Sequence, residues 1–277
     1  MGGGVVVTGA STGIGKACAV ALANNGFTAL GTVRSERDAD VLKALGVTPV
    51  TMDVTDAASI SAARHTVNES LGETKLVALV NNAGVMGAGP LEHIPLDDMR
   101  RVYEVNVIGT VAVTQAFLPA LKLSGGRIVN MSSVSGFIAP PFLGPYTASK
   151  FALEAVSDSL RRELVTQGVD VIVIEPGSVD TPIWDKAAQL DTGPFRGTLY
   201  EKVLDEVRSS AIAGGKAGIP TSVVAAAVVR ALTVRRPPAR IRVVKRPLRT
   251  SLMRMMPERL VDRMIARRLW GSAKHEI

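Results

Sequence analysis

The chain is poor in the residues that mark metal sites, disulfide frameworks and membrane spans. Its 277 residues include one cysteine and three histidines, so no internal disulfide can form and no ligand-like spacing points to a metal ion. The longest apolar runs, such as 76–80 and 223–229, fall far below the ~20 residues that span a bilayer. No basic segment followed by an apolar run precedes the first predicted strand, as a secretory signal would require. We therefore expect a cytoplasmic protein without a metal site.

Positive charge is concentrated at one end of the chain. The net charge is +7 at pH 7, but residues 1–234 hold 19 Lys and Arg against 22 Asp and Glu, whereas residues 235–277 hold 13 against 3. A strongly basic tail on a slightly acidic body indicates an appended element and not a uniform nucleic-acid-binding surface. We expect no nucleic-acid partner, because the tail lacks the interleaved aromatic residues of such surfaces.

Short β-branched runs alternate with longer stretches of 3.6-residue periodicity along most of the chain. This alternation predicts βαβ units and a parallel sheet. We expect a single α/β domain over residues 1–248, doubly wound in the Rossmann manner, with a seven-stranded parallel sheet and a nucleotide at the carboxyl ends of its strands. The predicted strands are 4–8, 28–33, 48–52, 76–81, 126–132, 170–175 and 240–244, and the predicted helices begin near Gly13, Arg37, Asp56, Leu96, Tyr146 and Thr221.

The long segment 177–219 interrupts this alternation. It carries Trp184, Phe195, Leu199 and Tyr200 before a glycine-rich stretch that we expect to be flexible. Long connections at the ligand end of such a sheet tend to be lids. We expect a helical substrate lid, and a surface excursion with its own small core is the alternative.

Residues 249–277 form a predicted basic helical extension. On a helix, Leu260, Met264 and Ile265 lie near one another while arginines occupy another strip. Helices of this kind bind anionic membrane surfaces peripherally in some proteins. Packing over a substrate opening or a partner subunit, and solvated charge above a buried apolar stripe, are the other two interpretations.

A glycine-rich loop directly follows the first predicted strand. It reads Thr8-Gly-Ala-Ser-Thr-Gly-Ile-Gly15, and an apolar helix pattern runs from Lys16 to Asn25. Glycines at such a turn let the backbone approach a pyrophosphate, and the positive end of the helix faces that anion. We interpret the loop as a phosphate-binding element, with an ordinary tight turn as the alternative.

A tyrosine and a lysine stand four residues apart at Tyr146 and Lys150, and Ser133 lies thirteen residues before the tyrosine. Helical geometry makes positions i and i+4 neighbours, so the ammonium favours the phenolate of a group whose unperturbed pKa is about 10. Such a pair is a usable general base near neutral pH. A bare Tyr-x-x-x-Lys match also arises by chance on exposed helix faces.

Taken together, these motifs resemble the short-chain dehydrogenase/reductase family, and the overall sequence is most like its retinol and hydroxysteroid dehydrogenase branch. The resemblance spans residues 8–181 in the family's order. The matching segments are Thr8-Gly9 through Gly15, Asp53, Asn81 through Gly84, Asn106, Ser133, Tyr146 with Lys150, and Pro176-Gly177 through Thr181.

The resemblance implies an NAD(P)-dependent oxidoreductase in which four residues carry the chemistry. Tyr146 exchanges the proton and Ser133, with Ser132 and Ser135 as its rivals, holds the substrate oxygen. Lys150 lowers the pKa of Tyr146 and binds the nicotinamide ribose, and Asn106 holds a water that links Lys150 to solvent. The residues expected to contact the cofactor are Gly9, Ser11, Thr12, Gly13, Ile14, Gly15, Arg34, Asp53, Val54, Asn81, Asn82, Ala83, Gly84, Tyr146, Lys150, Pro176, Gly177, Val179 and Thr181.

Some cofactor residues carry specific expectations. By resemblance, Asp53 accepts a hydrogen bond from the adenine amino group and Thr181 holds the carboxamide. A helix cap at Asp53 and a turn residue at Asn82 are the plain alternatives.

The end of the second predicted strand favours NADP over NAD. An acidic residue there binds the ribose 2′-hydroxyl, whereas a nearby Arg accommodates a 2′-phosphate. Val33 takes the acidic place and Arg34 follows it. Two residues count against this preference: Thr12, at a position where many NADP-dependent relatives carry a second basic residue, and the nearby Glu36. The alternative interpretation is that Arg34 only caps the end of the strand.

The expected substrate is a lipophilic alcohol, ketone or aldehyde, because the candidate pocket residues are apolar. These residues are Met86, Val134, Phe137, Ile138, Pro140, Pro141, Phe142, Trp184 and Phe195. The resemblance also implies a homo-oligomer, a dimer or a tetramer. The competing hypothesis is a non-catalytic NAD(P)-binding sensor or scaffold that uses the basic tail to bind a partner.

Overall fold

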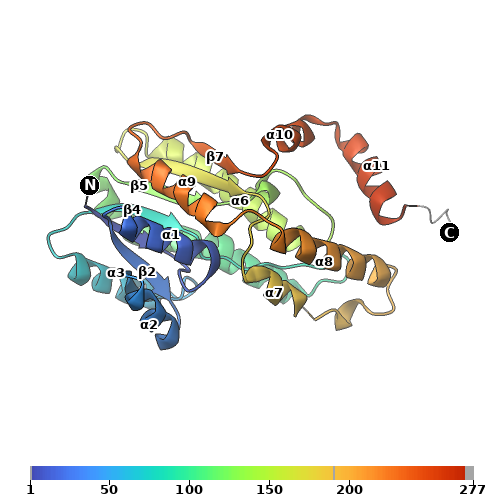
Figure 1. The fold of residues 1–277 in the computed structure, drawn as a ribbon, viewed down its shortest axis with the longest axis horizontal. Coiled ribbons are helices and arrows are strands. Elements are labelled where there is room, and N and C mark those ends of the chain that lie inside the picture. The colour runs from blue at the N-terminus through green and yellow to red at the C-terminus, as the bar shows by residue number, and fades with distance from the viewer. Residues whose placement is uncertain (1, 190, 272–277) are drawn as a thin grey trace.

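Seven parallel strands form the centre of the computed structural model, which describes residues 2–189 and 191–271 (Figure 1). Their order is β3-β2-β1-β4-β5-β6-β7, which confirms the predicted doubly wound α/β sheet. The strands are β1 (Gly4–Val7), β2 (Thr28–Val33), β3 (Thr48–Thr51), β4 (Leu76–Asn81), β5 (Arg127–Met131), β6 (Asp170–Pro176) and β7 (Arg240–Val243).

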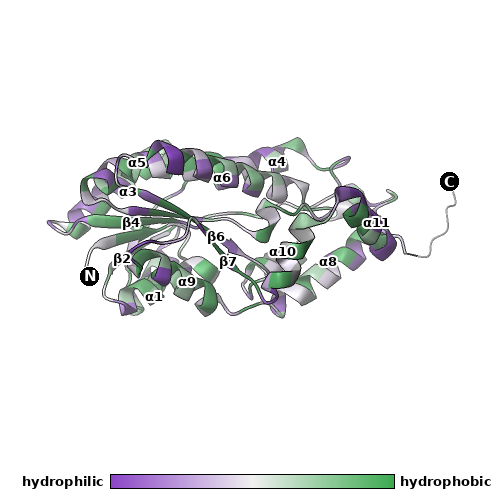
Figure 2. Ribbon diagram, turned by 90° about the horizontal axis from the view of Figure 1, so that it is seen from above, coloured by the Kyte–Doolittle hydropathy of each residue, from purple (hydrophilic) through white to green (hydrophobic). Residues whose placement is uncertain are grey.

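Helices cover both faces of the sheet (Figure 2). One face carries α1 (Gly13–Asn24), α2 (Glu36–Ala44) and α9 (Thr221–Thr233). The other carries α3 (Ala57–Leu71), α4 (Leu96–Tyr103), α5 (Gly109–Ser124) and α6 (Gly144–Glu163). Strands covered on both sides read as continuous apolar runs, and Val5, Val6 and Val7 are fully buried.

Strand β1 lies where the strand order reverses, between β2 and β4. Val6 pairs with Leu30 on one side and with Leu79 on the other. The loops that leave the carboxyl ends of β1 and β4 therefore start side by side. Doubly wound sheets bind their ligands at this place.

Helices α4 and α5 join through a π-helical turn at Glu104–Ile108 into one run, Leu96–Ser124. By length and composition alone this run is long and apolar enough to cross a membrane, although charged residues such as Asp97, Asp98 and Arg100 interrupt it. Val113, Phe117 and Leu121 of α5 are almost fully buried and pack against the sheet. This packing accounts for the apolar character of the run.

The described residues of the segment expected to be a lid form two α-helices, α7 (Ile183–Ala188) and α8 (Glu201–Lys216), and a 3-10 turn at Gly193–Phe195. The glycine-rich stretch that we expected to be flexible is the last turn of α8. A Cβ on Gly215 would lie 2.1 Å from the ring of Trp184, and the Trp184 indole donates a hydrogen bond to the Val179 carbonyl over 2.8 Å. Glycine at this position lets α8 pack closely on the tryptophan, and the flexibility of the stretch stays a prediction.

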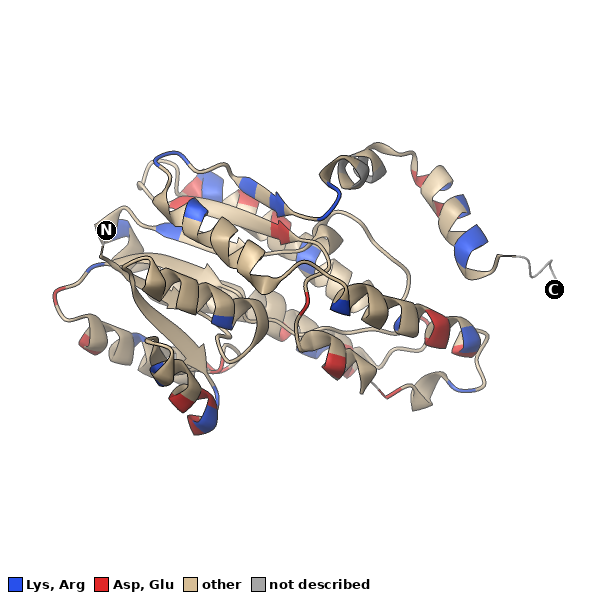
Figure 3. Ribbon diagram, viewed as in Figure 1, with Lys and Arg blue, Asp and Glu red and all other residues tan. Residues whose placement is uncertain are grey.

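Two helices follow β7 and project away from the body, α10 (Pro247–Met255) and α11 (Glu258–Leu269) (Figure 1). No residue of α11 is buried, which contradicts the interpretation of its apolar stripe as buried core. Basic and acidic residues lie next to one another on α11 (Figure 3), and the basic ones are Arg259, Arg263, Arg267 and Arg268. Residues 272–277 of the predicted extension lie outside the described residues.

Candidate active site

Two threonines hold the glycine-rich loop in place. The Thr8 hydroxyl accepts hydrogen bonds from the backbone N–H groups of Asn82 and Ala83, both over 2.9 Å, and the Thr32 hydroxyl accepts one from Gly9 over 3.1 Å. The Asn82 amide donates to the carbonyls of Thr8 and Gly9. Asn82 is therefore more than a turn residue, because it ties the end of β4 to the loop after β1. Thr32 gave no signal in the sequence, whereas Thr8 opens the glycine motif.

The loop closes only with glycine at its critical positions. Gly9 and Gly13 have φ values of +64° and +56°, which glycine adopts without strain. A Cβ on Gly15 would lie 2.2 Å from the Gly9 carbonyl oxygen. Thr12, the N-cap of α1, makes no side-chain capping bond, so the first N–H groups of α1 remain available to phosphate oxygens.

The end of β6 returns to the same loop. Thr181 lies 3.4 Å from the place of a Cβ on Gly13, and the backbone N–H of Gly177 donates to the Val243 carbonyl over 2.9 Å. Val179 is buried and forms a bridge to Ile219 at the far end of the lid. The predicted segment 176–181 therefore borders the phosphate loop.

Asp53 and Arg34 form an exposed pair just after the ends of β3 and β2. Their side chains approach to 3.7 Å, a separation at which a surface ion pair contributes little. Asp53 also accepts hydrogen bonds from the backbone and hydroxyl of Thr55, and these bonds, more than Arg34, lower its pKa. The helix-cap alternative for Asp53 is wrong, because Asp56 caps α3 through the Ala58 N–H.

Two buried asparagines, Asn81 and Asn106, link the elements around the site through hydrogen bonds. Asn81 donates to the Thr114 hydroxyl and to the Asn130 side chain, both over 2.9 Å. Asn106 is fully buried, and it lies in the π-helical turn, a local geometry frequent at functional sites. Its amide donates to the Val85 carbonyl and to the Ser149 hydroxyl, both over 2.9 Å, so both of its N–H donors are used. Asn106 thus contacts the residue before Lys150, and its role in holding water stays a prediction.

Ser133, Tyr146 and Lys150 meet at the carboxyl end of β5. The Tyr146 hydroxyl shares a hydrogen bond with the Ser133 side chain, and Ser133 also accepts from the Ser135 N–H over 3.1 Å. The Lys150 ammonium donates to the Met131 carbonyl over 2.8 Å and lies 5.6 Å from the centroid of the Tyr146 ring. Helix α6 brings the tyrosine and the lysine onto one face, as their spacing predicts.

Burial dominates the electrostatics of this pair. It raises the pKa of the Tyr146 hydroxyl, and the hydrogen bond with Ser133 lowers it in part. Burial and Ser133 are the main influences on the phenol, and the expectation that Lys150, whose ammonium lies 5.6 Å from the ring centroid, lowers this pKa stays a prediction. Burial also lowers the pKa of Lys150 to about 8, against the opposing influence of Glu154.

The segment 177–219, which we expect to be a lid, contacts the loop between Ser133 and Tyr146. Phe142 in that loop has φ +65°, a conformation that costs a bulky residue about 1–3 kcal/mol, and its ring stands edge-on to Tyr200 of the lid at 5.9 Å. The Tyr200 hydroxyl donates to Glu92 over 3.0 Å. Phe195, predicted to line the pocket, is instead buried against Gly89. The other predicted pocket residues are partly buried: Met86, Val134, Phe137, Ile138, Pro140, Pro141, Phe142 and Trp184.

Known proteins resemble this chain in sequence and in fold. The family model for short chain dehydrogenases matches residues 4–191. A NADPH-dependent 3-dehydrocapnine reductase from Ornithobacterium rhinotracheale is 35% identical over 94% of either chain. Retinol dehydrogenase 5 from Mus musculus is 40% identical over 65% of this chain and 57% of its own. A short chain dehydrogenase/reductase from Burkholderia phymatum, solved in complex with NAD, superposes with a TM-score of 0.78 at 26% identity over 95% of both chains. The chain therefore belongs to the short-chain dehydrogenase/reductase family and is an NAD(P)-dependent oxidoreductase.

Proposed function

We propose that this enzyme reduces lipophilic ketones or aldehydes with NADPH, and oxidises the matching alcohols in the reverse direction. The observation that carries the proposal is the Ser133, Tyr146 and Lys150 cluster beside a glycine loop shaped for a pyrophosphate. The bound nicotinamide supplies or accepts the hydride. The protein's task is to hold the substrate oxygen and to move one proton at that oxygen.

Tyr146 donates this proton in a reduction, and the Ser133 hydroxyl holds the substrate oxygen as its charge develops. Because burial raises the pKa of Tyr146, the phenol is protonated at neutral pH. A protonated phenol suits the donor role in reduction. Lys150, charged below about pH 8, compensates the negative charge that forms on the tyrosine oxygen.

The preference for NADP rests on Arg34. The side chain of Arg34 is 75% exposed and its pairing with Asp53 is loose, so the guanidinium is able to turn to a 2′-phosphate. The similar reductase from Ornithobacterium rhinotracheale uses NADPH, which supports the same choice. Steady-state kinetics with NADPH and NADH test it, and a clear preference for NADH would contradict it.

The lipophilic substrate is proposed from the partly buried apolar residues between Ser133 and Tyr146. Val134, Phe137 and Ile138 follow the serine directly, and Phe142 faces the lid. A pocket lined in this way favours apolar ligands and fixes them through a few polar groups. Here those polar groups are the hydroxyls of Ser133 and Tyr146.

Replacing Ser133 by Ala should lower kcat about 10²–10³-fold, the usual cost of losing one donor to a developing oxyanion. Ser132→Ala is the matched control. The Ser132 hydroxyl is buried and has no hydrogen-bond partner among the described residues, so its removal should leave kcat within a few-fold of the wild type. Initial rates of NADPH consumption compare the two, and equal losses would refute the choice of Ser133.

We also propose that the tail contacts anionic membrane surfaces. Helices α10 and α11 expose Leu248, Leu252, Met255, Leu260 and Met264 by 45–86%, and Arg259, Arg263 and Arg267 lie exposed on α11. Exposed apolar side chains next to arginines fit the boundary between headgroups and acyl chains. The tail would then bring the active site to lipophilic substrates dissolved in the membrane.

Replacing Arg259, Arg263 and Arg267 together by Gln should weaken binding to vesicles of phosphatidylglycerol and phosphatidylcholine by about a hundredfold, at about 1 kcal/mol for each cation. Arg64, Lys75 and Lys122, three cations of the body, serve as the matched triple control. Sedimentation with vesicles measures both variants. Equal binding of the tail variant and the wild type would contradict membrane contact through these arginines.

A further inference from the structure

A chain of charged side chains runs from the last strand to the active site. Arg240 of β7 donates to Glu154 over 3.0 Å and to Asp158 over 2.9 Å. Glu154 and Asp158 follow Lys150 on α6 at intervals of four residues, so the three side chains lie along one side of the helix. The last strand thereby reaches the helix that carries the catalytic pair.

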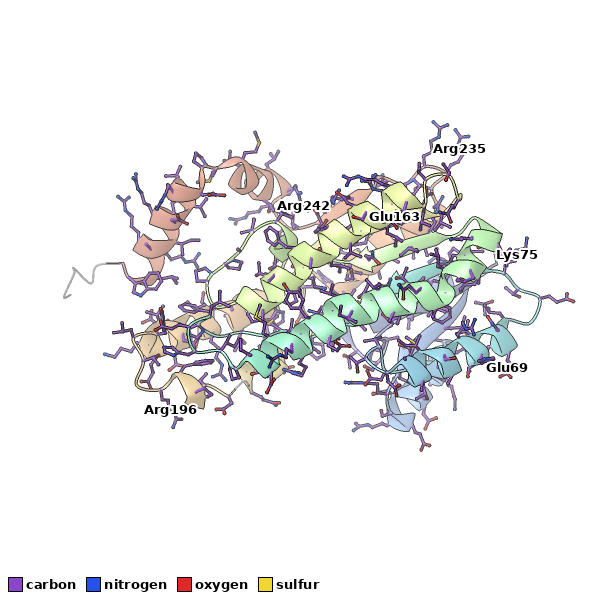
Figure 4. All side chains as sticks on the ribbon, turned by 180° about the vertical axis from the view of Figure 1, so that it is seen from behind. Glu69, Lys75, Glu163, Arg196, Arg235 and Arg242 are labelled. Atoms are coloured by element: carbon purple, nitrogen blue, oxygen red, sulfur yellow. The ribbon has the colours of Figure 1, made fainter. Side chains whose placement is uncertain are left out.

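The same chain contains a buried carboxylate. Glu175 follows the apolar run of β6 as its last residue but one and is only 2% exposed. Arg242 donates to it over 3.0 Å and Arg240 lies 3.6 Å away. Because a buried charge is tolerated only when it is paired, Glu175 fixes both arginines of the edge strand. Arg242 lies where β7 ends and the tail begins (Figure 4).

This network contacts the turn that begins with Ser133 at two successive residues. A Cβ on Gly136 would lie 2.9 Å from the Glu154 Cγ atom and 2.8 Å from the Ser132 hydroxyl, so Glu154 lies directly against the backbone of Gly136. The guanidinium of Arg242 lies 4.5 Å from the centroid of the Phe137 ring. Glu154 and Arg242, at the two ends of the network, therefore both contact the segment that follows Ser133.

We propose that Glu154, oriented by Arg240, is a positioning residue of the reaction: it places a negative charge one helical turn from Lys150, and it packs against the Ser133 turn. The kinetic consequence of this inference rests on the proposed function, whereas its consequence for the protonation state of Lys150 does not. Without a charged Lys150, the negative charge that forms on Tyr146 during reduction loses its compensation.

The charged surroundings of Lys150 support this assignment. On α6 the lysine faces Tyr146 and Glu154, and from β5 it meets the Met131 carbonyl. Burial lowers its pKa and Glu154 raises it. Glu154 itself faces Arg240 and, more distantly, Glu175. Asp158 is engaged by Arg240, Arg161 and Arg162.

Glu154→Gln tests the charge without removing the side chain. Arg240 keeps Asp158 at 2.9 Å and Glu175 at 3.6 Å, so the variant leaves that arginine paired and should fold. The pKa of Lys150, about 8 in the wild type, should fall by about one unit, a tenfold change in its protonation equilibrium. Titration of the labelled lysine side chains by NMR measures it, with Lys150→Met to assign the signal.

Two further variants sharpen the result. Asp158→Asn removes a carboxylate that binds the same arginine but lies one turn farther from Lys150, so the Lys150 pKa should stay where it is. Glu154→Asp keeps the charge on a shorter side chain. The Lys150 pKa in this variant should lie between its values in the wild type and in Glu154→Gln. If the Gln variant is too unstable to titrate, Glu154→Met removes the same charge with an apolar side chain of similar length, and a Lys150 pKa equal to that of the wild type in Glu154→Met overturns the proposal.

The kinetic readout is the pH dependence of NADPH consumption with a lipophilic ketone such as 4-phenylcyclohexanone as probe. The rate should fall above the Lys150 pKa, and this fall should move to lower pH in Glu154→Gln in step with the NMR titration. A purely structural role of Glu154 would lower the rate at every pH without moving the fall. An unchanged Lys150 pKa in Glu154→Gln overturns the proposal, whereas a shifted pKa without turnover of any ketone contradicts only the proposed function.

Discussion

Tyr146→Phe is expected to abolish turnover while the fold and the cofactor affinity stay nearly intact. The variant loses only the hydroxyl that shares a hydrogen bond with Ser133. Proton transfer by a positioned side chain contributes about 10²–10⁴-fold to a rate, and the loss in kcat should lie in that range. Steady-state rates measure it, and quenching of protein fluorescence by NADPH measures cofactor affinity.

Tyr103→Phe is the matched control, because Tyr103 is another partly buried tyrosine, at the end of α4. Its kcat should equal that of the wild type. Turnover of Tyr146→Phe within tenfold of the wild type would refute Tyr146 as the proton donor. Loss of both turnover and NADPH binding would assign Tyr146 to the cofactor site instead.

Gly15→Ala is expected to damage the phosphate loop, with a cost in stability and a loss of cofactor binding. The added Cβ would lie 2.2 Å from the Gly9 carbonyl oxygen and 2.4 Å from the Asn82 amide nitrogen, so the backbone must shift. Overpacking of this kind costs about 1–3 kcal/mol. Thermal denaturation should show a lower Tm, and NADPH titration should show weaker binding.

Gly214→Ala, on helix α8, is the matched control and should raise the Tm where Gly15→Ala lowers it. A Cβ on Gly214 meets nothing within 4 Å, and alanine stabilises a helix interior by about 0.5–1 kcal/mol relative to glycine. This variant should keep its cofactor affinity and gain slightly in Tm. If both variants showed the same Tm and affinity, the steric role of Gly15 in the loop would be wrong.

The sheet was predictable because its strands are buried on both faces. Runs such as the one from Val171 to Ile174 are apolar and β-branched, and they stand between helices with clear 3.6-residue periods. The helix starts were visible for a similar local reason, since α4 and α9 begin at Leu96 and Thr221 as predicted. These signals depend on neighbours in the sequence.

The contacts that complete the site were not visible, because they join residues that are distant in the chain. Arg240 lies 86 residues from Glu154, and Thr8 lies 74 residues from Asn82. Periodicity gives no information on such pairs. The direction of the Tyr146 pKa was likewise decided by burial, a property of the whole fold, and not by the four-residue spacing to Lys150.

One measurement tests hydride transfer at Tyr146 most directly. It follows by absorbance the consumption of NADPH, and in parallel of NADH, by the wild type and by Tyr146→Phe with a panel of lipophilic ketones. The wild type should consume NADPH with at least one ketone, faster than it consumes NADH, and Tyr146→Phe should not. If the wild type bound NADPH but consumed neither cofactor with any ketone, and reduced neither oxidised cofactor with the matching alcohols, the chain would instead be a non-catalytic sensor or scaffold.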